Sequence, residues 1–158
     1  MHRNRFGRGV RTLAAACAAL ALLISQPLQA KDTTTMYPGI ITSRLAETKA
    51  FYMDNLGFEV RFENEWFVLL HRDNREIGFL LPEQPGQAPI FRKVFRGEGV
   101  WLTIEVPDAD AEYARVRALG VPIEVEIRDE PWGERHFSLK DPNGIGVDIV
   151  TYSPAEKQ

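Results

Sequence analysis

The chain of 158 residues contains a single cysteine, Cys17, and this scarcity excludes several kinds of site. One cysteine forms no intrachain disulfide and no zinc site of several thiolates. Cys17 also lies inside an apolar run and is followed by Ala18, which makes it a poor candidate for a lipidated mature terminus. If the leader described next is removed, the remaining protein has neither a thiolate ligand nor a cysteine nucleophile.

Acidic residues are absent from the first thirty residues, which differ in kind from the rest. Residues 2–11 carry four arginines, residues 12–24 are a short apolar run, and the segment ends at the small residue Ala30. These three parts are typical of a secretory signal peptide, and the run is shorter than the roughly twenty residues of a membrane-spanning helix. We therefore predict a cleaved signal peptide at residues 1–30 and a periplasmic or secreted protein without a stable membrane anchor.

Two other interpretations of the leader stay open. The segment can remain uncleaved as an anchor. Alternatively, the start codon is misplaced, because Met36 stands where a cytoplasmic protein would begin, and the protein is then cytoplasmic.

Positive charge is scarce after the leader. Residues 31–158 keep 15 of the 19 basic residues and all 22 acidic ones, which gives a formal net charge of −7. Binding to a phosphate backbone needs a basic face, so we expect no nucleic acid partner. The 128 residues are enough for one domain with a hydrophobic core.

One order of elements occurs twice in residues 31–158. The first copy has a helix that Ser43 can cap and that Gly57 ends, and the second has a helix that Asp108 can cap and that Gly120 ends. The predicted elements of the first copy are a strand at 36–42, a helix at 43–56 and strands at 58–62, 66–71 and 77–81, with the polar turn Asp73-Asn74 between the last two. Those of the second copy are a strand at 100–106, a helix at 109–119 and strands at 122–127, 135–140 and 146–152.

Each copy is therefore a βαβββ module. Module one covers about residues 36–83, the linker residues 84–99, and module two about residues 100–153. One such unit is too small to bury a sheet alone, whereas two can share a core. The sequence predicts an α+β fold in which two tandem βαβββ modules form a cupped mixed sheet with a concave cavity.

Several motifs resemble those of the vicinal oxygen chelate superfamily, which includes glyoxalases, bleomycin-resistance proteins and dioxygenases. The segment Phe51-Tyr52…Asn55-Leu-Gly-Phe58 is similar to its FY…LGF element, and Ile104-Glu-Val106 before Asp108 is similar to the entry of its second module. The run Asp129-Glu-Pro-Trp-Gly-Glu-Arg135-His-Phe137, followed by Asp141-Pro-Asn-Gly144, resembles its D-x-P-W-G-x-R-x-F…D-P-x-G signature. The resemblance covers about residues 36–153.

The signature predicts structure more than chemistry. Asp141 to Gly144 is expected to be a turn, because proline fixes φ and glycine accepts a positive φ. Pro131-Trp132-Gly133 is expected to turn the chain and bury the indole. We interpret Trp132 and Arg135 as braces of module two, with contact to a ligand as the alternative.

The resemblance implies four metal-chelating positions on the strands, and here they hold Tyr37, Gly78, Trp101 and Asp148. Divalent ions need several carboxylate or imidazole donors, and only Asp148 supplies one. The three histidines do not restore the set: His2 lies in the leader, His71 is expected in solvent, and His136 faces away from both of its neighbours in the sequence. The sequence predicts no metal and no cofactor.

A small-molecule site is expected in place of the chelate. Side chains alternate along a strand, so we predict that the ligand contacts Tyr37, Trp101, Thr103, Glu105 and Asp148. Two acids beside an indole and a phenol favour an aromatic or cationic ligand. The alternative is that Trp101 simply fills the cavity. If the concave cavity excludes water, the pKa of Glu105 would rise and its carboxylate could act as a general base, but no catalytic residue is assigned.

These observations leave three hypotheses. The first is a metal-free protein that binds a small molecule. The second is a metal-dependent enzyme of the glyoxalase or dioxygenase kind, with Glu105, Asp148 and His136 as a misplaced ligand set. The third is an accessory dimer that binds no ligand. The resemblance implies a homodimer, and whether the modules pair within or between chains stays open.

Overall fold

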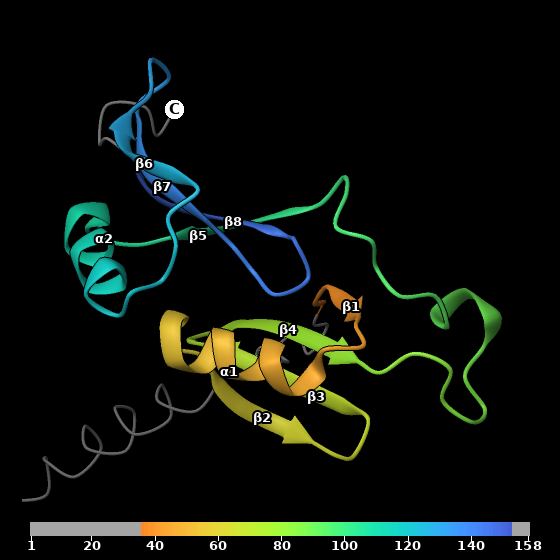
Figure 1. Cartoon of the computed structure of the whole chain (residues 1–158). Coiled ribbons are helices and arrows are strands. Elements are labelled where there is room, and N and C mark those ends of the chain that lie inside the picture. The colour runs from red at the N-terminus through yellow and green to blue at the C-terminus, as the bar shows by residue number, and fades with distance from the viewer. Residues whose placement is uncertain (1–35, 153–158) are drawn as a thin grey trace, which may run out of the picture. The chain divides into compact units, whose positions relative to one another are not determined.

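The computed structural model describes residues 36–152, which fall within one compact unit, Met36–Gln158. The predicted signal peptide lies outside the described residues. Module one comprises β1 (Gly39–Ile41), α1 (Leu45–Leu56), β2 (Glu59–Glu63), β3 (Phe67–Arg72) and β4 (Arg75–Leu80). Module two comprises β5 (Trp101–Glu105), α2 (Ala109–Ala118), β6 (Val125–Asp129), β7 (Glu134–Lys140) and β8 (Gly146–Tyr152), and the short 3₁₀ helix η1 (Pro89–Phe91) lies between the modules (Figure 1).

The two modules share one topology. Their sheets have the strand orders β1-β4-β3-β2 and β5-β8-β7-β6. The pairs β1–β4 and β5–β8 are parallel, and all other neighbouring strands are antiparallel. The predicted repeat and the α+β fold are therefore confirmed. The expected single cupped sheet differs from the structure, because within residues 36–152 no ladder joins one four-stranded sheet to the other.

Helix α1 begins later than predicted. Its N-cap residue is Arg44, which makes no side-chain capping bond, so the prediction that Ser43 caps the helix is wrong. The preceding hydroxyl is used instead: Thr42 Oγ1 accepts a hydrogen bond from the backbone N–H of Arg44 at 2.9 Å. Gly57 ends the helix with a φ of 67°, a conformation that suits glycine.

Helix α2 follows the sequence prediction more closely. The Oδ1 atom of Asp108 accepts a hydrogen bond from the N–H of Ala111 at 3.0 Å, as expected of an N-cap aspartate. Val116 of this helix is fully buried. Leu119, the last residue of the predicted helix, is instead the C-cap residue and is exposed.

Strand β1 is shorter than its apolar sequence suggests. Pro38 has no N–H to donate, so regular pairing with β4 begins only at Gly39. The carbonyl of Pro38 still accepts a hydrogen bond from the N–H of Gly78 at 2.9 Å. The chain just before β1 therefore continues beside β4 without being counted as strand.

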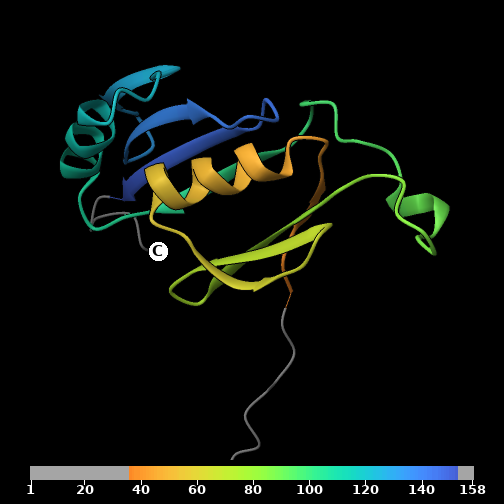
Figure 2. The same cartoon turned by 60° about the horizontal axis from the view of Figure 1, so that its bottom comes forward.

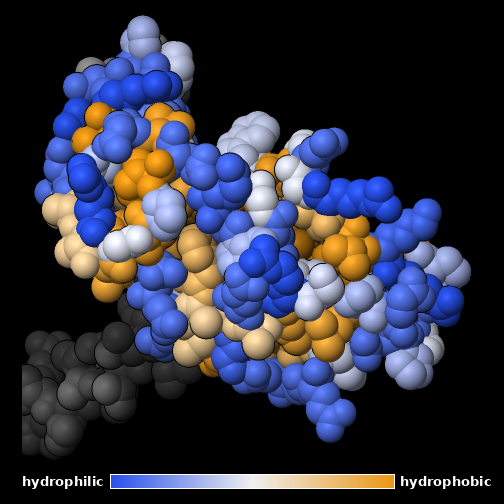
Figure 3. Space-filling view, in the orientation of Figure 1, coloured by the Kyte–Doolittle hydropathy of each residue, from blue (hydrophilic) through white to orange (hydrophobic). Residues whose placement is uncertain are grey.

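One hydrophobic core joins the modules. Tyr52 and Leu56 of α1 and Val147 and Ile149 of β8 are fully buried and belong to the same cluster. Figures 1 and 2 show α1 lying over the strands of its own sheet, with the strands of module two on its other side. Hydrophobic side chains also reach the surface in patches among hydrophilic ones (Figure 3). No helix within residues 36–152 is long and apolar enough to cross a membrane.

The linker forms a protruding arm, which we define as residues 82–94. It carries η1 and extends away from both sheets in Figures 1 and 2. The arm returns to the body at Phe95, whose N–H donates to the carbonyl of Ile41 at 2.9 Å and whose ring packs on the core.

Candidate ligand-binding site

Hydrogen bonds at the ends of the parallel strands fix how the modules correspond. In module one the N–H of Thr42 donates to the carbonyl of Leu80, and in module two the N–H of Val106 donates to the carbonyl of Val150, both at 2.8 Å. These bonds occupy the same place in the two ladders. A residue before α1 therefore corresponds to the residue 64 positions later, and a residue of β4 to the residue 70 positions later.

This correspondence confirms the internal alignment made from the sequence. Tyr37 corresponds to Trp101, and Gly78 of β4 corresponds to Asp148 of β8. The strand registers agree, since Gly39 pairs with Gly78 as its equivalent, Thr103, pairs with Asp148. The two modules thus have equivalent backbone positions at Gly78 and Asp148, and these positions carry different side chains.

In module one the equivalent position is covered by aromatic rings. A Cβ atom added at Gly78 would lie 3.0 Å from ring atoms of both Phe67 and Tyr37. Carbon atoms do not approach so closely without displacement, so a chelating side chain at this position would have to move the rings. Module one therefore offers an apolar surface at this point.

In module two a polar cluster surrounds Asp148. The Nδ1 atom of His136 lies 2.7 Å from Asp148 Oδ1, and the hydroxyl of Ser138 donates to the same oxygen at 2.7 Å. On the other side of the imidazole, Nε2 lies 3.0 Å from Glu130 Oε1, which also accepts a bond from Arg128 Nε at 2.6 Å. His136 and Ser138 thus hold the only carboxylate among the four predicted chelating positions, and Glu130 and Arg128 extend the network on the other side of the imidazole.

Two carboxylates flank the imidazole of His136 and favour its charged form. Burial, the largest influence, lowers the pKa of His136, but hydrogen bonds to Asp148 and Glu130 and the charges of these carboxylates outweigh it and raise the pKa above its usual value. Both ring nitrogens lie within hydrogen-bond distance of carboxylate oxygens, an arrangement that suits a ring with a proton on each nitrogen. Ser138 donates to Asp148 and not to the imidazole, and the cluster therefore lacks the serine–histidine bond of a nucleophilic site.

The same cluster does not fit a divalent ion. Asp148 and Glu130 lie on opposite nitrogens of the imidazole, so their oxygens do not point at a common centre. Within residues 36–152 no group of three or more histidine, cysteine, aspartate or glutamate side chains is arranged to hold a metal ion. The alternative ligand set of Glu105, Asp148 and His136 is therefore not assembled in this structure.

Strand β5 adds an exposed, acidic rim to this face. Trp101 is 72% exposed, and Thr103 and Glu105 follow it on the same side of the strand. At the end of β8, burial raises the pKa of Tyr152, and the charges of Glu134, Glu105 and Asp148 raise it further. The carboxylates therefore create a negative potential along this side of module two.

A cleft of about 500 Å³ lies beside β5. It is bounded by Tyr52, by Arg75 and Glu76 at the start of β4, and by Thr103 and Glu105. Two of the five predicted ligand-binding residues therefore line it, whereas Tyr37, Trp101 and Asp148 do not. We call the surface formed by Trp101, Thr103, Glu105, His136 and Asp148 the open face of module two.

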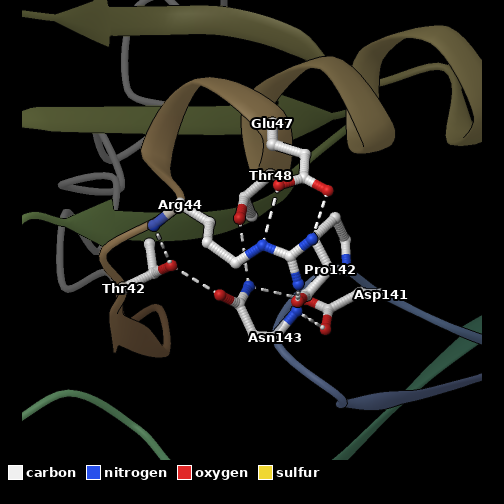
Figure 4. Close-up of polar contacts among 7 residues, drawn as sticks. All are labelled: Thr42, Arg44, Glu47, Thr48, Asp141, Pro142 and Asn143. Atoms are coloured by element: carbon white, nitrogen blue, oxygen red, sulfur yellow. Dashed lines mark hydrogen bonds and ion pairs between the residues drawn. The ribbon is translucent and has the colours of Figure 1, made fainter.

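The Asp141–Gly144 segment joins the modules (Figure 4). Thr42 Oγ1 donates to Asn143 Oδ1 at 2.5 Å, Asn143 Nδ2 donates to Thr48 Oγ1 at 3.1 Å, and Arg44 donates to the carbonyl of Pro142. As predicted, the segment is a turn, with a φ of 85° at Gly144.

Asp141 is the buried centre of this turn. It is only 4% exposed, and its Oδ1 accepts from the N–H groups of Asn143 at 2.8 Å and Ile145 at 2.9 Å. Its Oδ2 accepts from the hydroxyl of Tyr52 at 3.2 Å, and burial, followed by the charge of Asp141, raises the pKa of Tyr52 far above its usual value. Asp141 thus satisfies donors from both modules.

The remaining signature residues behave differently from each other. Arg135 contacts both oxygens of Asp110 on α2, at 2.6 and 2.7 Å, and Asp129 at 3.1 Å, as expected of a brace. Trp132 is 56% exposed and its indole N–H donates to Glu134 at 2.6 Å, so the prediction that it is buried is wrong. The list of predicted ligand-binding residues omitted His136 and Ser138, which contact Asp148, and Glu130, which contacts His136.

Comparisons with known proteins agree with the geometry. A family model described as the Glyoxalase/Bleomycin resistance protein/Dioxygenase superfamily matches residues 33–149. No curated protein sequence matches the chain. A crystal structure of a glyoxalase/bleomycin resistance protein/dioxygenase from Nocardioides is similar, with 20% identity, a TM-score of 0.65, and coverage of 78% of this chain and 87% of that one.

Two further solved structures carry more specific descriptions. A lactoylglutathione lyase from Agrobacterium tumefaciens has 22% identity and a TM-score of 0.62 over 75% of this chain and 93% of its own. TnmS3, an antibiotic-binding protein from Streptomyces sp. CB03234, has 20% identity and a TM-score of 0.58 over 77% of this chain and 98% of its own. At these identities the likeness shows the fold alone.

Proposed function

Because this chain belongs to the Glyoxalase/Bleomycin resistance protein/Dioxygenase superfamily, as its motifs predicted, we propose that it binds a small molecule on the open face of module two without a metal ion. The observation that carries this proposal is the state of the two equivalent strand positions. Gly78 lies under aromatic rings, and Asp148 is engaged by His136 and Ser138. Gly78 brings no donor atom and Asp148 is already bonded to two side chains, which supports a site without a metal, and Trp101 on the neighbouring strand β5 is exposed and can contact a ligand.

The proposed ligand is an aromatic cation. His136 and Arg128 balance the charges of Asp148 and Glu130, so this inner cluster contributes little net charge. The negative potential of the face then comes from carboxylates such as Glu105 and Glu134 near Tyr152. An exposed indole attracts a cation with about 0.5–2 kcal/mol, and stacking adds to it when the cation is planar. The antibiotic-binding protein of similar fold supports a carrier or sequestering role.

Tryptophan fluorescence tests ligand binding directly. We expect planar cations to quench the fluorescence of the protein, and uncharged or anionic molecules of the same shape to do so much less. The Trp101→Phe variant should lose the response, whereas the matched Trp66→Phe variant, which alters an exposed indole outside this face, should keep it. Quenching that persists in Trp101→Phe, or no response to any planar cation, would overturn the proposed site.

Elemental analysis separates this function from a metal-dependent lyase or dioxygenase. Protein purified without chelators should contain far less than one equivalent of iron, nickel, manganese or zinc. A stoichiometric content of any of them would refute the metal-free proposal and favour the enzyme.

We also propose that the protein is exported and acts as a homodimer. The basic and apolar leader supports export, and the exposed apolar side chains on both modules support association. N-terminal sequencing of secreted protein should begin at Lys31, and a start at Met36 would contradict export.

A further inference from the structure

The arm holds an apolar tip in a defined conformation. The side-chain oxygen of Gln87 accepts from the N–H of Gln84 at 3.0 Å, its amide nitrogen donates to the carbonyl of Phe91, and Arg92 Nε donates to the carbonyl of Gln87 at 2.7 Å. These bonds build the loop that presents Ile90 and Phe91, which are 79% and 54% exposed. The exposure is therefore imposed by the loop's own bonding.

The arm and the segment after it also hold most of the unpaired cations of the described residues. Of the thirteen lysines and arginines within residues 36–152, nine form ion pairs with carboxylates. The four others are Arg75, Arg92, Lys93 and Arg96. Arg92 and Lys93 directly follow the apolar tip, and Arg96 lies just after the arm. In Figure 3 the arm protrudes at the right, and its visible surface is mainly hydrophilic. A partner for this segment must offer both apolar surface and negative charge.

The chain itself carries such a surface. On the open face of module two Trp101 is 72% exposed, and Glu105 lies on the same strand. The chain after residue 30 has a net charge of −7, so a second copy attracts a cationic segment, whereas an anionic membrane would repel most of the molecule. Ile90 is 79% exposed within a single copy, so the arm does not fold back onto its own body.

We propose that the arm of one copy docks on the open face of module two of a second copy, with Ile90 and Phe91 against Trp101 and the arm's cations toward the carboxylates of that face. The proposal rests on the homodimer proposed above and supplies its interface. A twofold axis lets each copy give one arm and receive one, which closes the assembly at two chains. Phe91 of each copy then lies beside the ligand site of the other.

Engineered cysteines test this contact, because Cys17 is the only native cysteine. In full-length chains carrying Cys17→Ser, one copy would carry Phe91→Cys and the other Trp101→Cys. Mixing them under mild oxidation should give a disulfide-linked dimer, since such bonds need Cα atoms within about 7 Å. The matched pair of Phe91→Cys with Leu119→Cys, an exposed site on α2, should link at least tenfold less. Equal linking of the two pairs would overturn the proposal.

Sedimentation equilibrium then separates this interface from the rest of the functional proposal. The Ile90→Ser/Phe91→Ser variant should raise the dimer dissociation constant at least tenfold, and the Leu119→Ser control should leave it unchanged. A dimer insensitive to the arm variant would refute the arm contact alone, and a monomer at all concentrations would refute the homodimer as well.

A monomer that binds phosphatidylglycerol vesicles through the arm would assign the arm to a membrane instead. Fluorescence titration of the arm variant reports ligand binding independently of all these outcomes.

Discussion

The two modules have one topology and nearly one register, yet their open faces differ in chemistry. In module one, Tyr37 and Phe67 cover the backbone of Gly78, whereas in module two the equivalent Asp148 takes part in a part-buried network of ion pairs and hydrogen bonds. The comparison teaches that backbone geometry sets where a site can form, and that side-chain size and charge decide which module forms it. Four substitutions test this difference.

The largest effect on the free energy of unfolding is expected at the turn around Asp141, which differs from the corresponding turn of module one at Asp73. Asp141→Ala would leave the hydroxyl of Tyr52 and two backbone N–H groups without their acceptor, and should lower the free energy of unfolding by about 3–5 kcal/mol. The corresponding turn of module one is exposed, so Asp73→Ala should cost less than about 1 kcal/mol. Urea denaturation measures both. Equal losses would show that the Asp141 turn is no special link between the modules.

A second substitution tests the crowding of module one. Gly78→Ala places a Cβ atom against two rings and should cost about 1–3 kcal/mol. Gly146 is the matched control, because its nearest neighbour is a Trp101 carbon at 3.8 Å, so Gly146→Ala should be close to neutral. Thermal denaturation distinguishes them. A neutral Gly78→Ala would mean that the rings move aside easily and that this surface is not fixed.

The charge of module two should appear in the pH dependence of stability. The pKa of His136 is raised on folding, so its contribution is fully present below the unfolded value of about 6.5 and is lost as the pH rises through the higher folded value. Denaturant midpoints measured between pH 5 and 9 should therefore fall over this window. His136→Gln should flatten the curve, because it removes the titrating imidazole. An unchanged curve in His136→Gln would contradict the assigned charge.

The smallest effect on stability is expected at the most exposed part of the open face. Trp101→Ala should change the free energy of unfolding by less than about 0.5 kcal/mol, because the indole is 72% exposed. It should nevertheless weaken the binding of a planar cation about tenfold, measured by calorimetry. The exposed Trp132 serves as control, and Trp132→Ala should leave the affinity unchanged.

The sequence predicted the repeat well, because apolar periodicity and glycine helix ends depend on local residues. It also located the equivalent positions Gly78 and Asp148, since their spacing from recognisable motifs is constant. It misplaced the helix start at Ser43 and the burial of Trp132, because capping and burial depend on which neighbours the fold brings near. The sequence did not reveal that the two sheets are separate, because the residues of one module do not show whether its edge strands pair with those of the other.

The polar network around Asp148 was only partly within reach of the sequence. Strand alternation places His136 and Ser138 on one face of β7, and the β7–β8 register brings both next to Asp148. The register itself is set by the length of the turn and was not known in advance. Glu130 lies beyond the end of β6, so no periodicity predicted its contact with the imidazole.

Tyr52 of α1 and Thr42 just before it bond to residues of the Asp141–Gly144 turn that lie 89 and 101 positions later. During synthesis the helix therefore emerges long before its partners exist, and Tyr52 and Thr42 must wait for almost the whole polypeptide. Contacts of such long range slow folding. In a half-made chain α1 can already pack on β3 and β4, whereas Thr42 and Tyr52 lack their hydrogen-bond partners until the Asp141–Gly144 turn has been made.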